Sequence, residues 1–125
     1  MKKVDIWVDG SALKATEGRF YCGSGAVVVY KGKTKEISQS IGYATVNIAE
    51  LKAPILALSV LKESCKVTIM SDSQYTIDTQ IKWYLGWERR GFITQSGGVV
   101  KNKDLIQQLK KLSLEHSVEW VKVKS

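Results

Sequence analysis

Residues 4–11, VDIWVDGS, carry the pattern that best predicts the fold of this chain. Apolar and polar residues alternate from Val4 to Val8, which is the period of a β-strand with one buried face. The run ends at Asp9-Gly10, a pair typical of turns. We therefore predict a strand that stops at Asp9 and leaves its carboxylate at the edge of a sheet.

Working outward from this strand, hydrophobic periodicity and turn residues mark out seven further elements. Gly18, Gly23 and Gly25 interrupt the next stretch, and Lys31-Gly32-Lys33 predicts a hairpin turn. Thr45 is a typical N-cap for the first helix. The predicted strands are 4–8, 26–30, 35–43, 66–70 and 118–123, and the predicted helices are 45–61, 75–83 and 104–112.

This order, β-β-β-α-β-α-α-β, predicts an α/β fold with a five-stranded mixed sheet, because helical crossovers join parallel strands. A chain of 125 residues is the size of one domain, so residues 1–125 are expected to form a single unit. No helix is expected after the last strand, where an αβ unit would normally continue.

Composition narrows the class of partner. The net charge of +7 favours polyanions such as nucleic acid, although many basic proteins bind none. No apolar run approaches the length of a membrane span, and no signal peptide fits before the first strand. Cys22 and Cys65 lack a C-x-x-C partner and are expected to be reduced thiols. We therefore expect a cytoplasmic protein without a membrane partner.

Three acidic residues are placed where they could meet. Asp9 follows the first strand, Asp72 follows the strand 66–70, and Glu50 lies about one turn into the first helix. If the two strands are parallel neighbours, both aspartates emerge at the same sheet edge. Hard oxygen ligands of this kind suit Mg²⁺ or Mn²⁺. From spacing alone, three unrelated polar residues at element ends explain the pattern as well.

Short motifs surround these residues and continue along the chain. They are VDGS at 8–11, NIAEL at 47–51, SDSQY at 71–75, WYLGWERRGF at 83–92, VKNKDL at 100–105 and VEWVK at 118–122. Together they resemble the motifs of the type 1 ribonuclease H family. The resemblance covers essentially the whole chain, and the order of the acids, with Glu50 before Asp72, matches it.

The resemblance implies a ribonuclease H-like fold and a metal-dependent endonuclease that cuts RNA in RNA/DNA hybrids. Family members use two Mg²⁺ ions, for which Mn²⁺ can substitute; Asp9, Glu50 and Asp72 would be both the metal ligands and the catalytic residues. It also implies contacts with the hybrid, including 2′-hydroxyls that distinguish RNA from DNA. The implied contact residues are Gly10, Ser11, Thr45, Asn47, Ser73, Gln74, Trp87, Arg89, Arg90, Phe92 and Lys101.

Some of these residues have structural alternatives. Thr45 can seat a DNA-strand phosphate or simply cap its helix. Trp83 and Trp87 are four residues apart and can pack a helix on the core; we expect Trp83 in the core and Trp87 in a groove for the DNA strand. His116, the only histidine, is expected at the surface.

The sequence departs from the family pattern at two places. Pro54 removes the N–H that would bond the carbonyl of Glu50, so we expect the helix to kink or to begin late and to re-aim Glu50. The family continues after the last strand with a His-containing loop and a helix carrying a fourth carboxylate, whereas this sequence ends at Ser125. We expect impaired activity and an uncovered sheet face that self-associates or binds a partner chain.

Two classes of function therefore follow from the sequence. One is a hybrid-cutting endoribonuclease, which the three carboxylates favour. The other is a non-catalytic module that binds a hybrid or a partner protein, which the absent closing segment favours.

Overall fold

In a computed structural model of the chain, residues 1–14 and 20–124 are described. The elements follow the order β-β-β-α-β-α-α-α-β, one helix more than predicted. The extra helix, α3, lies in an aromatic stretch between the second and third predicted helices. The bounds are β1 Lys2–Lys14, β2 Phe20–Tyr30, β3 Lys33–Ala44, α1 Val46–Ser59, β4 Cys65–Ser71, α2 Gln74–Ile81, α3 Tyr84–Arg89, α4 Lys103–Leu114 and β5 Ser117–Lys122.

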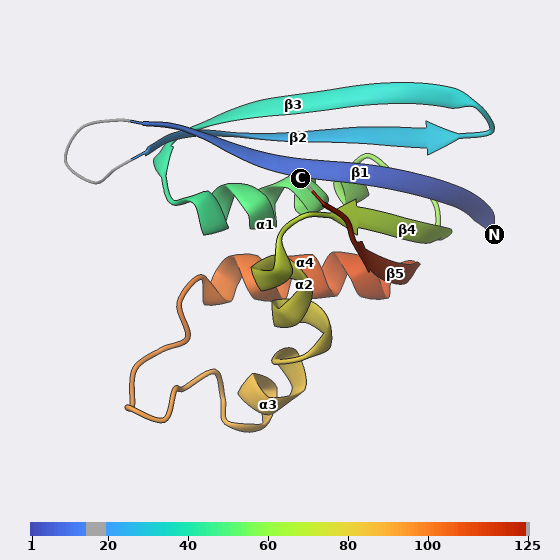
Figure 1. Cartoon of the computed structure of the whole chain (residues 1–125). Coiled ribbons are helices and arrows are strands. Elements are labelled where there is room, and N and C mark those ends of the chain that lie inside the picture. Colours follow the sequence, from blue (N-terminus) through green and yellow to red (C-terminus); the bar gives the residue numbers. More distant parts are fainter. Residues whose placement is uncertain (15–19, 125) are drawn as a thin grey trace.

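The strands form one mixed sheet in the order β3-β2-β1-β4-β5. β1 pairs antiparallel with β2 and parallel with β4, and β4 pairs parallel with β5. The five-stranded mixed sheet and the α/β class predicted from the sequence are therefore confirmed. In Figure 1 the long strands β1, β2 and β3 run along the top of the view, and the helices lie below them.

The glycines of β2 do not interrupt it, which corrects the prediction of a break before residue 26. β2 begins at Phe20, and Gly23 and Gly25 each pair with residues of both neighbouring strands. The hairpin turn is confirmed: Lys31 and Gly32 have φ values of 50° and 77°, the left-handed pair that suits a two-residue hairpin. Ladder hydrogen bonds on both sides hold the glycines extended, and local propensity cannot foresee that.

β1 also continues past its predicted end. It runs beyond Asp9 to Lys14 because β2 stays paired with it as far as Lys14↔Phe20. Its parallel pairing with β4, however, stops at Val8↔Ser71. Asp9 is therefore inside a strand, yet it is the first residue past the parallel ladder.

One face of the sheet packs against α1 and α4 to form the core. Alternate residues of β1 and β4 point into it, and Ile6 and Ile69 are fully buried. Leu51 and Leu58 of α1 and Leu109 of α4 meet them from the helical side. On the opposite face Trp7 is 45% exposed, since no helix of the described residues covers it. Among those residues there is also no helix long and apolar enough to cross a membrane.

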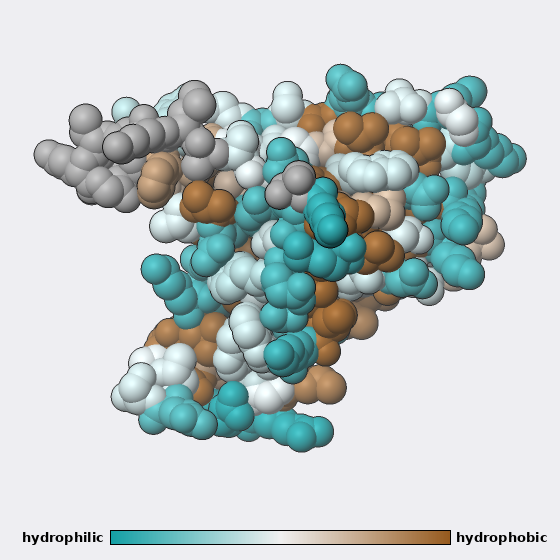
Figure 2. Space-filling model, viewed as in Figure 1, coloured by the Kyte–Doolittle hydropathy of each residue, from teal (hydrophilic) through white to brown (hydrophobic). Residues whose placement is uncertain are grey.

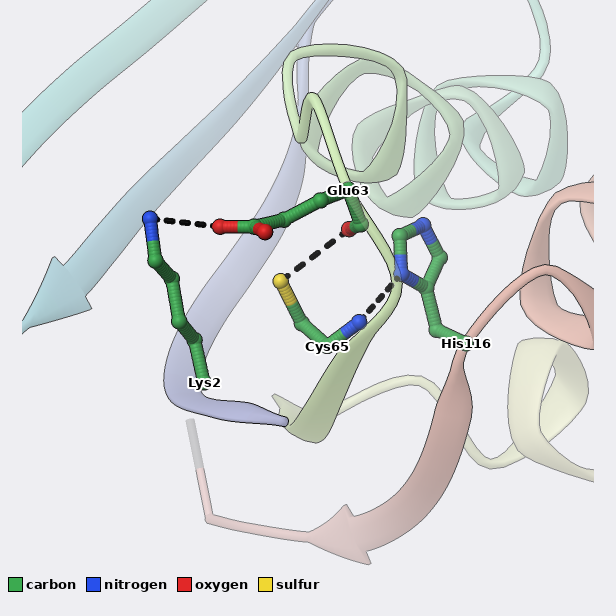
Figure 3. A network of polar contacts seen from close by, with 4 residues as sticks. All are labelled: Lys2, Glu63, Cys65 and His116. Carbon is green, nitrogen blue, oxygen red and sulfur yellow. Dashed lines mark hydrogen bonds and ion pairs between the residues drawn. The ribbon is translucent and has the colours of Figure 1, made fainter.

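At the N-terminal end of β1, polar contacts tie three strands together, as Figure 3 shows. Lys2 pairs with Glu63, the Cys65 thiol donates to the carbonyl of Glu63, and the Cys65 N–H donates to Nδ1 of His116 at 3.0 Å. His116 is half-buried, so the expectation of a plain surface residue is wrong. Both cysteines are free and buried, as predicted.

Candidate active site

Asp9 and Asp72 are neighbours because of strand register. Val8 and Ser71 are the last parallel pair between β1 and β4, and each aspartate is the next residue in its chain. Beyond this point β4 leaves the sheet to begin α2, while β1 remains paired with β2. Figure 1 shows the chain leaving β4 toward α2 while β1 continues beside β2.

Glu50 reaches the same place because α1 packs closely on β1. A Cβ on Gly10 would lie 2.6 Å from backbone atoms of Ala49 and Glu50, so only glycine permits this approach. The buried hydroxyl of Ser24 donates to the carbonyl of Ala49 at 2.7 Å and anchors the same turn from β2. Strand and helix are therefore in backbone contact at the residue that carries the third carboxylate.

The predicted effect of Pro54 is corrected by this geometry. α1 begins at Val46, directly after its N-cap, and continues through Pro54 to Ser59, so it does not begin late. Glu50 still meets the two aspartates. Close packing on Gly10 fixes its position, and this outweighs the loss of one intrahelical hydrogen bond.

The three carboxylates form a tight cluster. One oxygen from each of Asp9, Glu50 and Asp72 lies within 4.8 Å of the others. Burial, and secondarily the charges of Asp72 and Asp9, raise the pKa of Glu50 from 4.5 to about 7, against a weaker opposing effect of the Gly10 amide. Burial also raises the pKa of Asp9, with Asp72 as the second cause. Glu50 and Asp9 therefore resist ionisation unless positive charge is added.

The donor set fits a hard divalent cation. Glu50 is 8% exposed and its buried Oε2 has no hydrogen-bond partner, which is a costly state for a carboxylate oxygen. Within the described residues the one salt bridge is between Lys2 and Glu63, so no described lysine or arginine pairs with the cluster. An ion with oxygen ligands would satisfy the orphan oxygen and offset the repulsion, as Mg²⁺ and Mn²⁺ do in carboxylate sites.

Several predicted contact residues surround this cluster. Ser11 is exposed on β1, Thr45 and Asn47 are exposed at the N-terminus of α1, and Gln74 is exposed at the start of α2. Thr45 accepts from the Ile48 amide at 3.2 Å, so its capping role is confirmed. Ser73 caps α2 in the same way, accepting from the Thr76 amide. The main role of Gly10 here is steric, as described above.

The basic segment after α2 is built around aromatic rings. Trp83 stacks between Tyr75 and Trp87, with ring centroids 6.3 and 5.6 Å apart. Trp83 is 37% exposed, so its predicted place in the core is wrong. Trp87 packs partly buried against the core, and its role in a groove for the DNA strand stays a prediction. Figure 2 shows a largely hydrophilic surface at the lower end of the molecule, where Figure 1 draws α3.

Within that segment the predicted contacts divide by exposure. Arg89, Arg90 and Lys101 are exposed, as a phosphate-contacting role requires. Phe92 is 5% exposed and packs edge-to-face on Tyr84 at 5.4 Å. The predicted place of Phe92 in a DNA groove is therefore corrected, because its ring is buried in the core.

Comparison with known proteins identifies the family of this chain. The family model for RNase H matches residues 1–125. The chain belongs to the RNase H family. Relatives in this family include Ribonuclease H of Shewanella halifaxensis, 41% identical over 99% of this chain and 75% of its own length. Ribonuclease HI of Shewanella oneidensis is 41% identical over 99% of this chain and 77% of its own length.

Solved structures agree with this family assignment. LC9-RNase H1, described as a type 1 RNase H with the type 2 active-site motif, superposes with a TM-score of 0.87 at 27% identity. It is matched over 99% of this chain and 64% of its own chain. LC11-RNase H1, solved in complex with an RNA/DNA hybrid, shares the fold with a TM-score of 0.61 at 20% identity, over 97% of this chain and 85% of its own. The predicted resemblance and ribonuclease H-like fold are thus confirmed.

Sequence reasoning missed several residues that build this RNase H site. Ser24 was not singled out, although its hydroxyl holds the turn that carries Glu50. Gly25, predicted as a break, faces Asp9 across the β1–β2 ladder. Alternation along β2 could have found Ser24, since Cys22, Ser24 and Ala26 share the buried face, and it places Gly25 on the opposite face.

Proposed function

We propose that the chain is a metal-dependent endonuclease that hydrolyses the RNA strand of RNA/DNA hybrids. The observation that carries this proposal is the convergence of Asp9, Glu50 and Asp72 around an unpartnered buried oxygen, in a chain of the RNase H family. The names of its relatives give the substrate class, and the carboxylates give the chemistry.

In this proposal Asp9, Glu50 and Asp72 would together hold two Mg²⁺ ions. Bound ions would supply a nucleophilic water and stabilise charge on the leaving 3′ oxygen. The chain's own contribution is to hold the three carboxylates close together, and bound cations would keep them ionised. Close packing of α1 on Gly10 and the strand register at Val8↔Ser71 perform that task.

The hybrid would lie across the ends of α1 and α2. The helix N-termini expose backbone amides there, and Thr45 and Asn47 stand beside them, a setting that favours phosphate and sugar oxygens. Arg89, Arg90 and Lys101 would contact phosphates of the DNA strand. The remaining proposed contacts are Ser11 on β1 and Ser73 and Gln74 at the N-terminus of α2.

The test is cleavage of a labelled hybrid with Mg²⁺ and with Mn²⁺, beside single-stranded RNA and duplex DNA. Asp9→Asn should abolish cleavage while hybrid binding remains, because the amide preserves shape but removes a metal ligand. Glu119→Gln, an exposed acid on β5, is the matched control and should cut normally. Cleavage that survived Asp9→Asn would assign the activity to a contaminant or to another site.

A second candidate is a non-catalytic module that binds hybrid or a partner protein, and the uncovered sheet face is the observation that favours it. Register places four apolar residues in one row across that face: Val27, Trp7, Met70 and Val121. Self-association or a partner chain would cover this row. A strictly monomeric species in sedimentation velocity would count against self-association, and hybrid binding no tighter than duplex DNA binding would leave partner binding as the better assignment.

A further inference from the structure

A shallow hollow of about 380 Å³ leads away from the carboxylates on the uncovered face of the sheet. Gly23 and Gly25 form its floor, facing Ser11 and Asp9 across the β1–β2 ladder and Ser40 and Ser38 on β3. Because neither glycine has a side chain, the sheet surface is lowered from Asp9 outward. The hollow is therefore continuous with the proposed catalytic site.

The chemistry of the hollow suits sugars better than phosphates. None of its lining residues, all within the described part of the chain, is a lysine or an arginine. Its polar side-chain groups beyond Asp9 are mainly hydroxyls, from Ser11, Ser38 and Ser40. Hydroxyls donate and accept, which matches the 2′-hydroxyl of ribose rather than an anion.

Two exposed tyrosines stand at the far end of this hollow. Tyr21 lines it and pairs across the β2–β3 ladder with Tyr43, ring centroids 5.6 Å apart and nearly perpendicular. The side chains are 46% and 66% exposed, and the Tyr21 hydroxyl lies 2.8 Å from Oγ of Ser40. Cross-strand pairing explains the edge contact between the rings but not the large area left in water.

The spacing relates these rings to the cleaved bond. Gly25 faces Asp9, and Tyr21 lies four residues farther along β2, which is about 13 Å at strand spacing. A duplex strand advances roughly 3.4 Å of helix axis per phosphate. The tyrosines are thus about four nucleotides from a phosphate held at Asp9.

We propose that Tyr21 and Tyr43 bind the RNA strand about four nucleotides from the cleaved phosphate. The rings pack against ribose and base edge, and the Tyr21–Ser40 hydroxyl pair bonds a 2′-hydroxyl. This inference rests on the proposed function, since it assumes that the strand cut at Asp9 continues along the hollow. It makes the tyrosine pair a specificity determinant for ribose at a distance from the reaction.

The test uses hybrids with one short ribonucleotide block as the cleavage site. The hybrid region extends either two or eight base pairs beyond that block, on one side or the other. Tyr43→Ser should raise KM about five- to tenfold on the substrate extended toward the tyrosines and leave kcat unchanged, which is the lower range for loss of an aromatic contact with a base. On the shortest substrate it should match the parent.

Two further variants keep this test decisive. Tyr21→Phe, which keeps the ring, should lose discrimination between ribose and deoxyribose at the distal position. Leu114→Ser, a change at a 73% exposed apolar residue at the end of α4, is the control and should alter neither constant. Thermal melts of each variant separate a binding effect from unfolding. Equal KM values for parent and Tyr43→Ser on the long substrates would overturn the inference.

Binding measured without turnover separates this inference from the proposed function. Fluorescence anisotropy in the Asp9→Asn background reports hybrid affinity in the absence of cleavage. If the parent cuts and the tyrosine variants bind as it does, the inference fails and the function stands. If the parent does not cut but long hybrids still bind through the tyrosines, the inference stands and the nuclease proposal fails.

Discussion

Replacing Glu50 with glutamine should stabilise the metal-free protein at alkaline pH. The Glu50 side chain is 8% exposed, and one of its oxygens has no hydrogen-bond partner. Burial and the neighbouring charges of Asp72 and Asp9 raise its pKa from 4.5 to about 7. Ionised Glu50 is therefore a destabilising group until a cation reaches it, and glutamine removes that charge with little change in shape.

The sign and size of the effect follow from proton linkage. A folded pKa above the unfolded one means that the folded chain holds more protons between pH 4.5 and about 7, so stability falls as pH rises through that window. At about 1.4 kcal/mol per pH unit, the full penalty above pH 7 is at most about 3.5 kcal/mol. Solvent near the cluster screens part of it, so we expect a gain of about 1–2 kcal/mol for Glu50→Gln at pH 8.

The assay is urea denaturation in EDTA at pH 5 and at pH 8. The stability difference between Glu50→Gln and the parent should be near zero at pH 5 and reach its full value at pH 8. Glu119→Gln, on the exposed face of β5, is the control and should show no such pH dependence. A variant less stable than the parent at pH 8, or a gain that does not change with pH, would refute the reasoning.

Three further predictions follow from the same geometry. Gly10→Ala should cost about 1–3 kcal/mol, because its Cβ would meet backbone at 2.6 Å. Gly25→Ala should cost much less, because the nearest atom to its Cβ would lie at 3.8 Å; denaturant midpoints compare the two. Calorimetry should show Mg²⁺ affinity falling about tenfold per pH unit below about pH 7, since binding must displace the Glu50 proton, and an affinity independent of pH would contradict this. The double variant Arg89→Ala/Arg90→Ala should release about two fewer counterions on hybrid binding and should leave metal binding unchanged. If the slope of log affinity against log salt concentration did not change, neither arginine would contact the hybrid.

The three proposed metal ligands can be selected from the sequence alone. Asp9, Glu50 and Asp72 lie in short motifs that resemble those of the family, and their order along the chain, with Glu50 before Asp72, matches it. Periodicity around Val4 and Val67 predicts two strands, because side-chain alternation is a local property of a half-buried strand. That these strands are parallel neighbours was only a condition of the sequence argument, and their pairing shows it. The mixed five-stranded sheet followed from the order of those local patterns.

Other features were decided only by tertiary structure, because they depend on groups distant in sequence. β1 passes through Asp9 as a strand because β2 supplies hydrogen bonds there, although Asp9-Gly10 is locally a turn pair. Pro54 does not re-aim Glu50, because contact between Gly10 and α1 fixes the helix. Phe92 is buried by Tyr84, eight positions away and on another element.

The electrostatics of the cluster also belong to the tertiary structure. A glutamate with a pKa near 7 needs burial and two nearby aspartates at once, and no sequence pattern specifies both. The sequence selects which oxygen atoms can bind a cation. Two tertiary features, the packing of α1 on β1 and the point where β1 and β4 diverge, bring these oxygen atoms within 4.8 Å of one another. At that separation they need a cation to offset their repulsion.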